Sequence, residues 1–194
     1  MNAIRKSIIL FAIVLIIASC TKKETSPPTV GESNSLLLAG TKGASKSWKI
    51  ASISQSENGG TPQSVTPATS TNPTGIPICE ADNIFMFSYN TAQGYQQTEG
   101  ATTCTSGDPS TIESGSWAFT DDGKTLLIDS FVNATTAQLQ SASEPFLGYM
   151  ILIYGAPLNV VQITATSLTV SYSFVDTSVS PSNTYVITLV FSAA

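Results

Sequence analysis

Three cysteines carry most of the reactive chemistry that this sequence offers. Cys20, Cys79 and Cys104 belong to a chain of 194 residues that contains no histidine. The absence of histidine excludes Ser-His and Cys-His nucleophile pairs, and also the usual zinc sites. The 13 Asp and Glu residues form no recognisable acid–base pair. We therefore expect no catalytic residues, no metal site, no cofactor and no enzymatic activity.

Cys20 directly follows an apolar segment near the N-terminus. Two positively charged residues, Arg5 and Lys6, precede an apolar run over residues 8–17, and this run is too short for a permanent membrane span. The letters IASC that end at Cys20 resemble the lipobox of bacterial lipoproteins. That resemblance implies a signal peptide over 1–19 and acylation of Cys20, for example with palmitate. The alternative is an ordinary secretory signal in which this cysteine has no role.

The stretch that follows the cysteine predicts how the protein is held. Residues 20–35 contain almost nothing to bury, so we expect the lipidated cysteine to be followed by a flexible tether. Two or more acyl chains give stable anchoring to a membrane. Surface-exported lipoproteins of Bacteroidetes-like bacteria often carry an acidic cluster here, whereas this chain has only Glu24. We expect a lipid anchor in the cell outer membrane that faces the periplasm.

Composition narrows the class of the remaining domain. Hydrophobic residues make up 42% of the chain, which is enough for a packed core, while charged residues make up only 11%. The net charge is −5, and no basic stripe is present that would neutralise phosphates. We therefore expect no nucleic-acid partner. The partners that we do expect are the membrane, through the N-terminal lipid, and a small apolar ligand if the barrel is hollow, and we expect a monomer.

Hydrophobic residues alternate with polar ones over most of the chain, which predicts an all-β domain over residues 36–194. The clearest case is the segment 167–175, where Leu168, Val170 and Tyr172 share one face. Turn residues such as Asp121-Asp122-Gly123 separate the candidate strands. These strands are 47–53, 83–89, 94–99, 115–120, 124–131, 149–154, 158–165, 167–175 and 184–191.

Two segments depart from this pattern. Residues 55–78 are rich in Ser, Thr, Pro and Gly, and we expect a long loop that is either disordered or passively inserted, or else a working lid. Residues 134–143 are the only segment in which we expect a short helix.

The other two cysteines are placed to form a disulfide. Cys79 and Cys104 lie at similar distances on either side of a hairpin turn predicted near Thr91 and Ala92. Residues equidistant from such a turn face each other in an antiparallel ladder, and an exported compartment permits the bond. The alternative is a redox or metal-binding pair, but the spacing is not that of a C-x-x-C motif.

The order of these features resembles the lipocalin-like domains of Bacteroidetes lipoproteins. It comprises SLLLAGTKGASKSWKI with Trp48, then CEADN at 79–83, a hairpin with Tyr95, Cys104, GSWAFTDDGKTLLI and ITATSLTVSYSF. The resemblance covers residues 36–192 and implies an up-and-down antiparallel β-barrel of about eight strands. The alternative is an immunoglobulin-like sandwich, which needs Greek-key crossings instead of a meander. The chain departs from lipocalins in ending with a strand and in lacking Gly-x-Trp at its first strand.

Two readings remain open for the aromatic and acidic residues. The aromatic set lines a ligand cup or simply fills the core; its members are Trp48, Phe85, Phe87, Trp117, Phe119, Tyr172 and Phe174. Asp82, Asp121 and Asp122 suggest either a calcium site or, more simply, tight turns.

Two functions follow from these readings. The first is a binding module whose barrel holds a small apolar or amphiphilic molecule, which requires a cavity. The second is a non-enzymatic structural or interaction module of the cell envelope, with a filled core and a contact surface on the outside.

Overall fold

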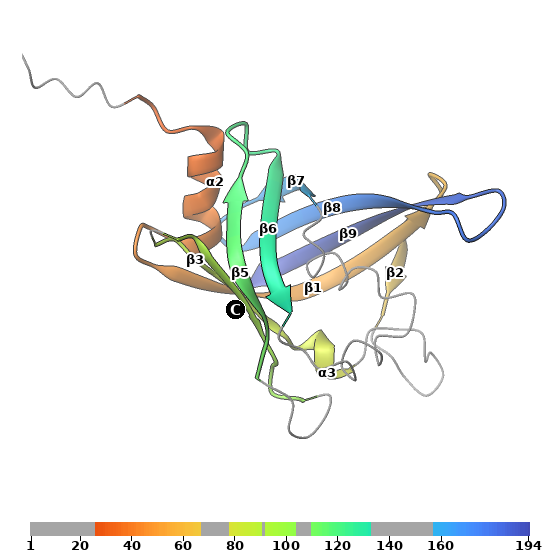
Figure 1. Cartoon of the computed structure of the whole chain (residues 1–194), viewed down its shortest axis with the longest axis horizontal. Helices are drawn as coiled ribbons and strands as arrows, with labels where there is room; N and C mark the ends of the chain where they lie inside the picture. Colours follow the sequence, from red (N-terminus) through yellow and green to blue (C-terminus); the bar gives the residue numbers. More distant parts are fainter. Residues whose placement is uncertain (1–25, 67–77, 91, 104–109, 133–156) are drawn as a thin grey trace, which may run out of the picture.

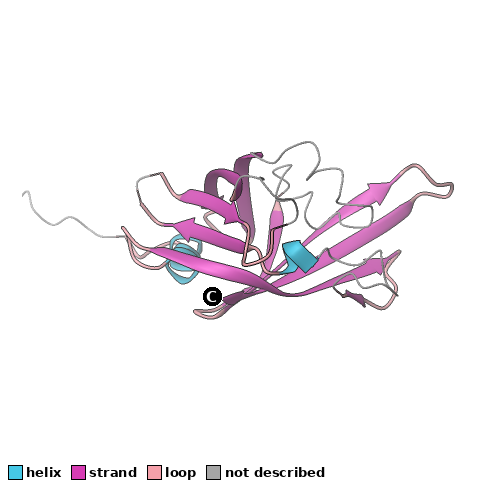
Figure 2. Cartoon of the chain, turned by 90° about the horizontal axis from the view of Figure 1, so that it is seen from below, coloured by secondary structure: helices cyan, strands magenta, loops and turns pink. Residues whose placement is uncertain are grey.

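Strands make up most of the domain. The computed structural model describes residues 26–66, 78–90, 92–103, 110–132 and 157–194. Within them lie two helices, α2 (Val30–Ala39) and α3 (Ile78–Ala81). The strands are β1 (Ser45–Glu57), β2 (Gln63–Val65), β3 (Ile84–Ser88), β4 (Gly94–Thr98), β5 (Thr111–Phe119), β6 (Thr125–Val132), β7 (Leu158–Ile163), β8 (Ser167–Asp176) and β9 (Asn183–Ala193). Figure 2 shows the helices as small additions to the sheet.

The sheet closes into an antiparallel barrel of eight strands, and β2 is one additional strand at its edge (Figure 1). From β3 to β9 each strand pairs with its neighbour in sequence. The barrel closes because β1 pairs with both β3 and β9. This meander confirms the predicted up-and-down barrel, and it is consistent with a lipocalin-like barrel. The immunoglobulin-like alternative is excluded because the order contains no Greek-key crossing.

The alternating segments form strands because one face of each is apolar. In β8, Leu168, Val170 and Tyr172 point into the barrel and are buried. Leu168 lies opposite Phe191 of β9, and Val170 lies opposite Leu189. The predicted turns fall where the strands end, as at Gly123, whose φ of 67° suits glycine.

Helix α2 was not predicted, and it corrects the N-terminal boundary of the domain. Thr29 and Glu32 form a capping box: the Thr29 hydroxyl accepts from Glu32 N at 3.1 Å, and the Glu32 carboxylate accepts from Thr29 N at 2.8 Å. The helix begins at Val30, so residues 30–35 are part of the folded domain. The predicted flexible tether over 20–35 is therefore wrong for its last six residues.

The buried face of α2 consists largely of small or polar residues, so a hydropathy analysis does not detect it. Gly31 lies so close to the β5–β6 turn that an added Cβ would stand 2.4 Å from the Thr120 carbonyl oxygen. Asn34 is buried, and its Nδ2 donates to the Gly123 carbonyl at 3.0 Å. The helix therefore packs against the end of the barrel through a glycine and an asparagine, and only its last turn is apolar.

The last turn of α2 covers the core at one end of the barrel. Leu38 is fully buried, and its carbonyl accepts from Trp48 Nε1 at 2.8 Å. Trp48 is itself fully buried on β1, and the Lys46 ammonium lies 4.5 Å from its ring centroid. The helix and the first strand are thus joined by a hydrogen bond that leaves no polar atom of the indole unpaired.

The predicted loop over 55–78 is shorter than expected. Residues 55–57 continue β1, where Gln55 lies opposite Ile187 and Glu57 opposite Tyr185 of β9. Gln63–Val65 adds β2 to the other side of β1. Both segments are polar, which explains why a hydropathy pattern placed them in a loop. The predicted strand 149–154 and the predicted helix 134–143 lie outside the described residues.

The β3–β4 hairpin has the strand pairing that the sequence pattern predicted. Phe87 lies opposite Tyr95, so the turn lies between these two residues. Cys79 is partly buried in α3, while Cys104 lies outside the described residues. The bond between the two cysteines therefore stays a prediction.

The two leucines of α2 give a matched test of its packing. We expect Leu38→Ala to lower the free energy of unfolding by about 2–5 kcal/mol, because it opens a cavity in the core. Leu36→Ala is the control: this side chain is 48% exposed, and the same substitution should cost less than about 1 kcal/mol. Urea unfolding of the two variants measures both values. Equal losses would show that α2 does not cover the core.

Candidate functional site

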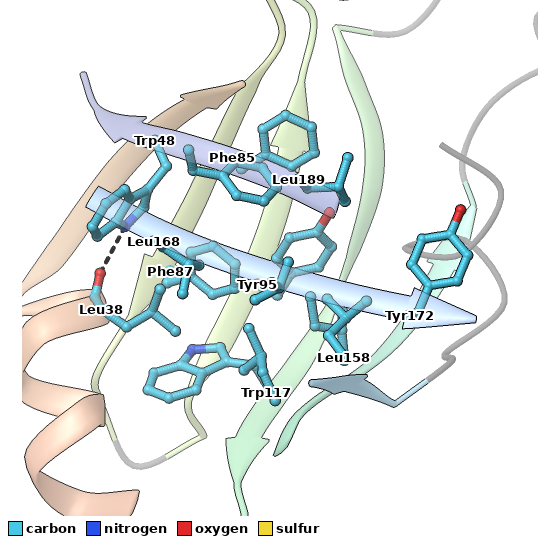
Figure 3. Close-up of a cluster of buried hydrophobic side chains, with 14 of the residues drawn as sticks. Leu38, Trp48, Phe85, Phe87, Tyr95, Trp117, Leu158, Leu168, Tyr172 and Leu189 are labelled. Atoms are coloured by element: carbon cyan, nitrogen blue, oxygen red, sulfur yellow. Dashed lines mark hydrogen bonds between the residues drawn. The ribbon is translucent and has the colours of Figure 1, made fainter. Parts of the chain in front are cut away.

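The predicted aromatic set occupies the barrel interior, and most of it is core. Five members are at most 3% exposed, while Phe119 and Phe174 are half-buried. Phe87 meets the Trp117 ring edge-on at 6.0 Å, and Trp117 meets Phe119 in the same way at 6.0 Å. Such T-shaped contacts fill space. Near α2 the structure therefore favours the core reading over a ligand cup (Figure 3).

The interior becomes polar farther along the same strands. The ladder places Gln97 of β4 between Phe85 of β3 and Glu113 of β5. Gln97 and Glu113 are both 0% exposed, and Asn83, just before β3, is 1% exposed. These three residues and Tyr95 belong to the inward-facing positions of consecutive strands. We call Asn83, Tyr95, Gln97 and Glu113 the inner polar cluster.

Two neutral donors hold the Glu113 carboxylate. Tyr95 OH donates to Oε2 at 3.1 Å, and Ser130 Oγ of β6 donates to Oε1. Burial raises the pKa of Glu113, while the hydrogen bonds from Ser130 and Tyr95 act in the opposite direction. Gly115 stands between Tyr95 and Ser130 in the ladder, and an added Cβ there would lie 2.1 Å from the Asp129 carbonyl oxygen. A glycine is therefore required for β5 and β6 to hold Ser130 at this carboxylate.

Several interior polar atoms have no hydrogen-bond partner among the described residues. Tyr95 OH lies 3.5 Å from Gln97 Oε1, and Gln97 Nε2 makes no hydrogen bond. Turning the amide over would let Nε2 donate to Tyr95 Oη but would leave Oε1 without a donor. Both amide atoms of Asn83 and the hydroxyl of Tyr172 also lack partners. Each such group costs about 1–3 kcal/mol, and native proteins keep few of them.

Figure 3 shows how two interior tyrosines lie relative to the packed end. The Tyr95 and Tyr172 side chains come from opposite walls, and both hydroxyls point away from α2. Beyond Tyr172, the rings of Tyr172 and Phe174 stack at 6.3 Å, and those of Phe174 and Tyr185 at 5.2 Å. The interior thus combines unpaired polar groups with a half-buried aromatic wall.

A groove, which we call the outer groove, lies beside α2 at the end of the barrel. It has a volume of about 780 Å³, and its walls combine aromatic rings, amides and both signs of charge. It is lined by Thr29, Gly31, Glu32, Ser35, Lys42, Gly43, Tyr89, Asn90, Gln93, Ala118, Phe119 and Asp121. Of the predicted ligand-lining residues, only Phe119 reaches this groove.

The predicted aspartates serve as turn and loop contacts. Asp122 Oδ1 accepts from Lys124 N at 3.1 Å within the β5–β6 turn, which confirms the turn reading. Asp82 Oδ2 accepts from Ala101 N and Thr102 N at 2.9 and 3.0 Å. Among the described residues, no three His, Cys, Asp or Glu side chains gather as a metal site would require.

Sequence reasoning missed the inner polar cluster, although β4 carried a usable signal. Tyr95, Gln97 and Glu99 alternate with outward-facing residues, so a strand with Tyr95 inside must also turn the other two inward. We did not predict that Gln97 and Glu99 face inward because barrel interiors are usually apolar.

Comparisons with other proteins add no further constraint. No protein-family model matches the sequence, and no curated protein matches it. In the part of the chain that the structure describes, neither helix has the length and hydropathy of a membrane span.

Glu80 of α3 makes the stability depend on pH. Its carboxyl is 6% exposed, and burial raises its pKa from 4.5 to about 7. The folded state therefore holds the proton more tightly than the unfolded chain. As the pH rises from about 4.5 to about 7, the unfolded state loses its proton first, so stability falls across this window and then levels off.

We expect Glu80→Gln to remove this loss. The free energy of unfolding of the variant should exceed that of the wild type by roughly 1–3 kcal/mol at pH 8 and by little at pH 4.5. Thermal unfolding at the two pH values would measure both differences. Glu57→Gln, at an exposed position of β1, should keep the wild-type pH profile. An advantage of Glu80→Gln that grows toward acid would contradict the assignment.

Proposed function

We propose that this protein is a lipid-anchored, non-enzymatic binding module of the bacterial cell envelope, whose barrel holds a small amphiphilic ligand. One observation carries the proposal. Asn83, Gln97 and Tyr172 are at most 3% exposed, yet each leaves polar atoms unpaired inside the barrel. A ligand whose polar atoms reach these groups would remove their desolvation cost.

The residues of the inner face support an amphiphile over a purely polar ligand. The stacked rings of Phe174 and Tyr185 form a half-buried apolar wall beyond the polar groups. An apolar tail packed on that wall gains about 25 cal/mol for each Å² that it removes from water. Head group and tail would thus meet different parts of one interior.

The captured ligand can be sought directly by native mass spectrometry. Every described contact of the domain falls between Thr29 and Ala194, so a chain that begins at Thr21 retains all of them. We expect this chain, exported to a bacterial periplasm and purified gently, to show a mass excess that disappears on solvent extraction. A bare polypeptide mass would contradict the proposal and favour a filled barrel.

The membrane anchor rests on Cys20 and has its own test. Cys20→Ala removes the acylated thiol, so we expect the variant to move from the outer-membrane fraction to the soluble periplasm. Thr21→Ala, at the adjacent position, should remain with the membrane. Immunoblots of the separated fractions give the result, and membrane association of the Cys20→Ala variant would show that the leader does not carry the anchor.

The outer groove supports the second candidate function, a structural or interaction module of the cell envelope. Its aromatic and amide walls suit contact with an envelope partner, and its place beside α2 is independent of the barrel interior. If native mass spectrometry shows only the polypeptide mass, this groove is the first surface to test for a partner.

A further inference from the structure

We propose that the ligand head group is cationic, an amine that pairs with Glu113 inside the barrel. The inference rests on the proposed function, and it names the chemical class of the ligand at that same site.

The chain has no counterion for this carboxylate among its described residues. It contains eight Lys and Arg residues and no histidine, and four of the eight precede residue 26. The other four are engaged or lie elsewhere: Lys46 donates to the Leu37 and Ala165 carbonyls, Lys42 lies over the Tyr89 ring, Lys124 pairs with Asp122, and Lys49 is exposed. Residues 67–77, 104–109 and 133–156 contain no Lys, Arg or His.

Within the described part of the chain, Glu113 is therefore a buried acid without a positively charged partner. A buried charge is costly unless it is paired, and the two hydroxyl donors supply hydrogen bonds but no charge. An ionised carboxylate offers about four acceptor sites, and Tyr95 and Ser130 use two of them. An ammonium group could take the remaining sites and supply the missing charge.

The neighbouring unpaired atoms point to the same place. Gln97 lies directly opposite Glu113 in the ladder, is fully buried and leaves one amide atom without a partner. Tyr95 contacts both side chains, so the three belong to one cluster. A ligand amine bound at Glu113 would bring its own neighbouring polar atoms within reach of the Gln97 amide. An anionic head group would instead face a carboxylate with no cation nearby.

Three probes of equal chain length separate the head groups. Octylamine, 1-octanol and octanoate each have eight carbons, carry a cationic, a neutral and an anionic polar end respectively, and stay monomeric at millimolar concentration. Titration calorimetry on the chain from Thr21 should show octylamine binding at least tenfold more tightly than octanol, with octanoate weakest. Quenching or shift of the fluorescence of the two buried tryptophans, Trp48 and Trp117, gives a second readout inside the barrel.

A variant pair then assigns the preference to one carboxylate. Glu113→Gln keeps the shape and removes the charge, so we expect the preference for octylamine over octanol to disappear while octanol affinity is kept. Glu57→Gln removes an exposed carboxylate and should keep the preference.

The outcomes distinguish this inference from the proposed function. Equal binding of octylamine and octanol by the wild type, or tighter binding of octanoate, would overturn the cationic head group and leave the amphiphile site standing. These wild-type comparisons hold even if Glu113→Gln does not fold. Failure of all three probes to bind, together with a bare mass of the purified chain, would overturn both.

Discussion

The pairing of β1 with β9 is the constraint on which the rest of the structure depends. It runs from Trp48 opposite Ala193 to Glu57 opposite Tyr185, and it turns an open meander into a barrel. Closure removes the free edges that an open sheet exposes and defines an inside for every strand. Side chains of a strand alternate between its two faces, so Trp48 and Ile50 share a face that Ile53 would not share in a regular strand. A register shift between Ile50 and Ser52 changes this alternation, and both Trp48 and Ile53 are buried.

The closed barrel divides its interior into two unlike halves. Near α2, aromatic rings pack edge to face, and the hydrogen bond from Trp48 to Leu38 joins the helix to β1. In the other half, Glu113 and Gln97 replace apolar residues at fully buried positions. Proteins commonly place such costly groups where function requires them and recover stability elsewhere. The packing of the apolar half therefore offsets the free energy that is lost by burying polar groups in the other half.

How far the fold could be predicted depended on whether burial and hydropathy agree. They agree in β8, where Leu168, Val170 and Tyr172 share one face in the sequence and that face is the buried one. They disagree in α2, whose contact with the barrel is made by Gly31 and Asn34, and at the end of β1, where Gln55 is held by pairing alone. The inner polar cluster was missed for the same reason: Gln97 is buried because the pleat alternates, whatever its hydropathy.

The position of α2 also bears on how a tethered barrel would be oriented. Nine residue steps separate Cys20 from Thr29, a span of at most about 30 Å. A lipid on Cys20 would therefore keep the α2 end of the barrel close to the membrane. Both tyrosine hydroxyls of the interior point away from α2, so the polar half would lie on the far side from the anchor (Figure 3). In that orientation a ligand would enter from the aqueous compartment, while the outer groove beside α2 would face the lipid surface.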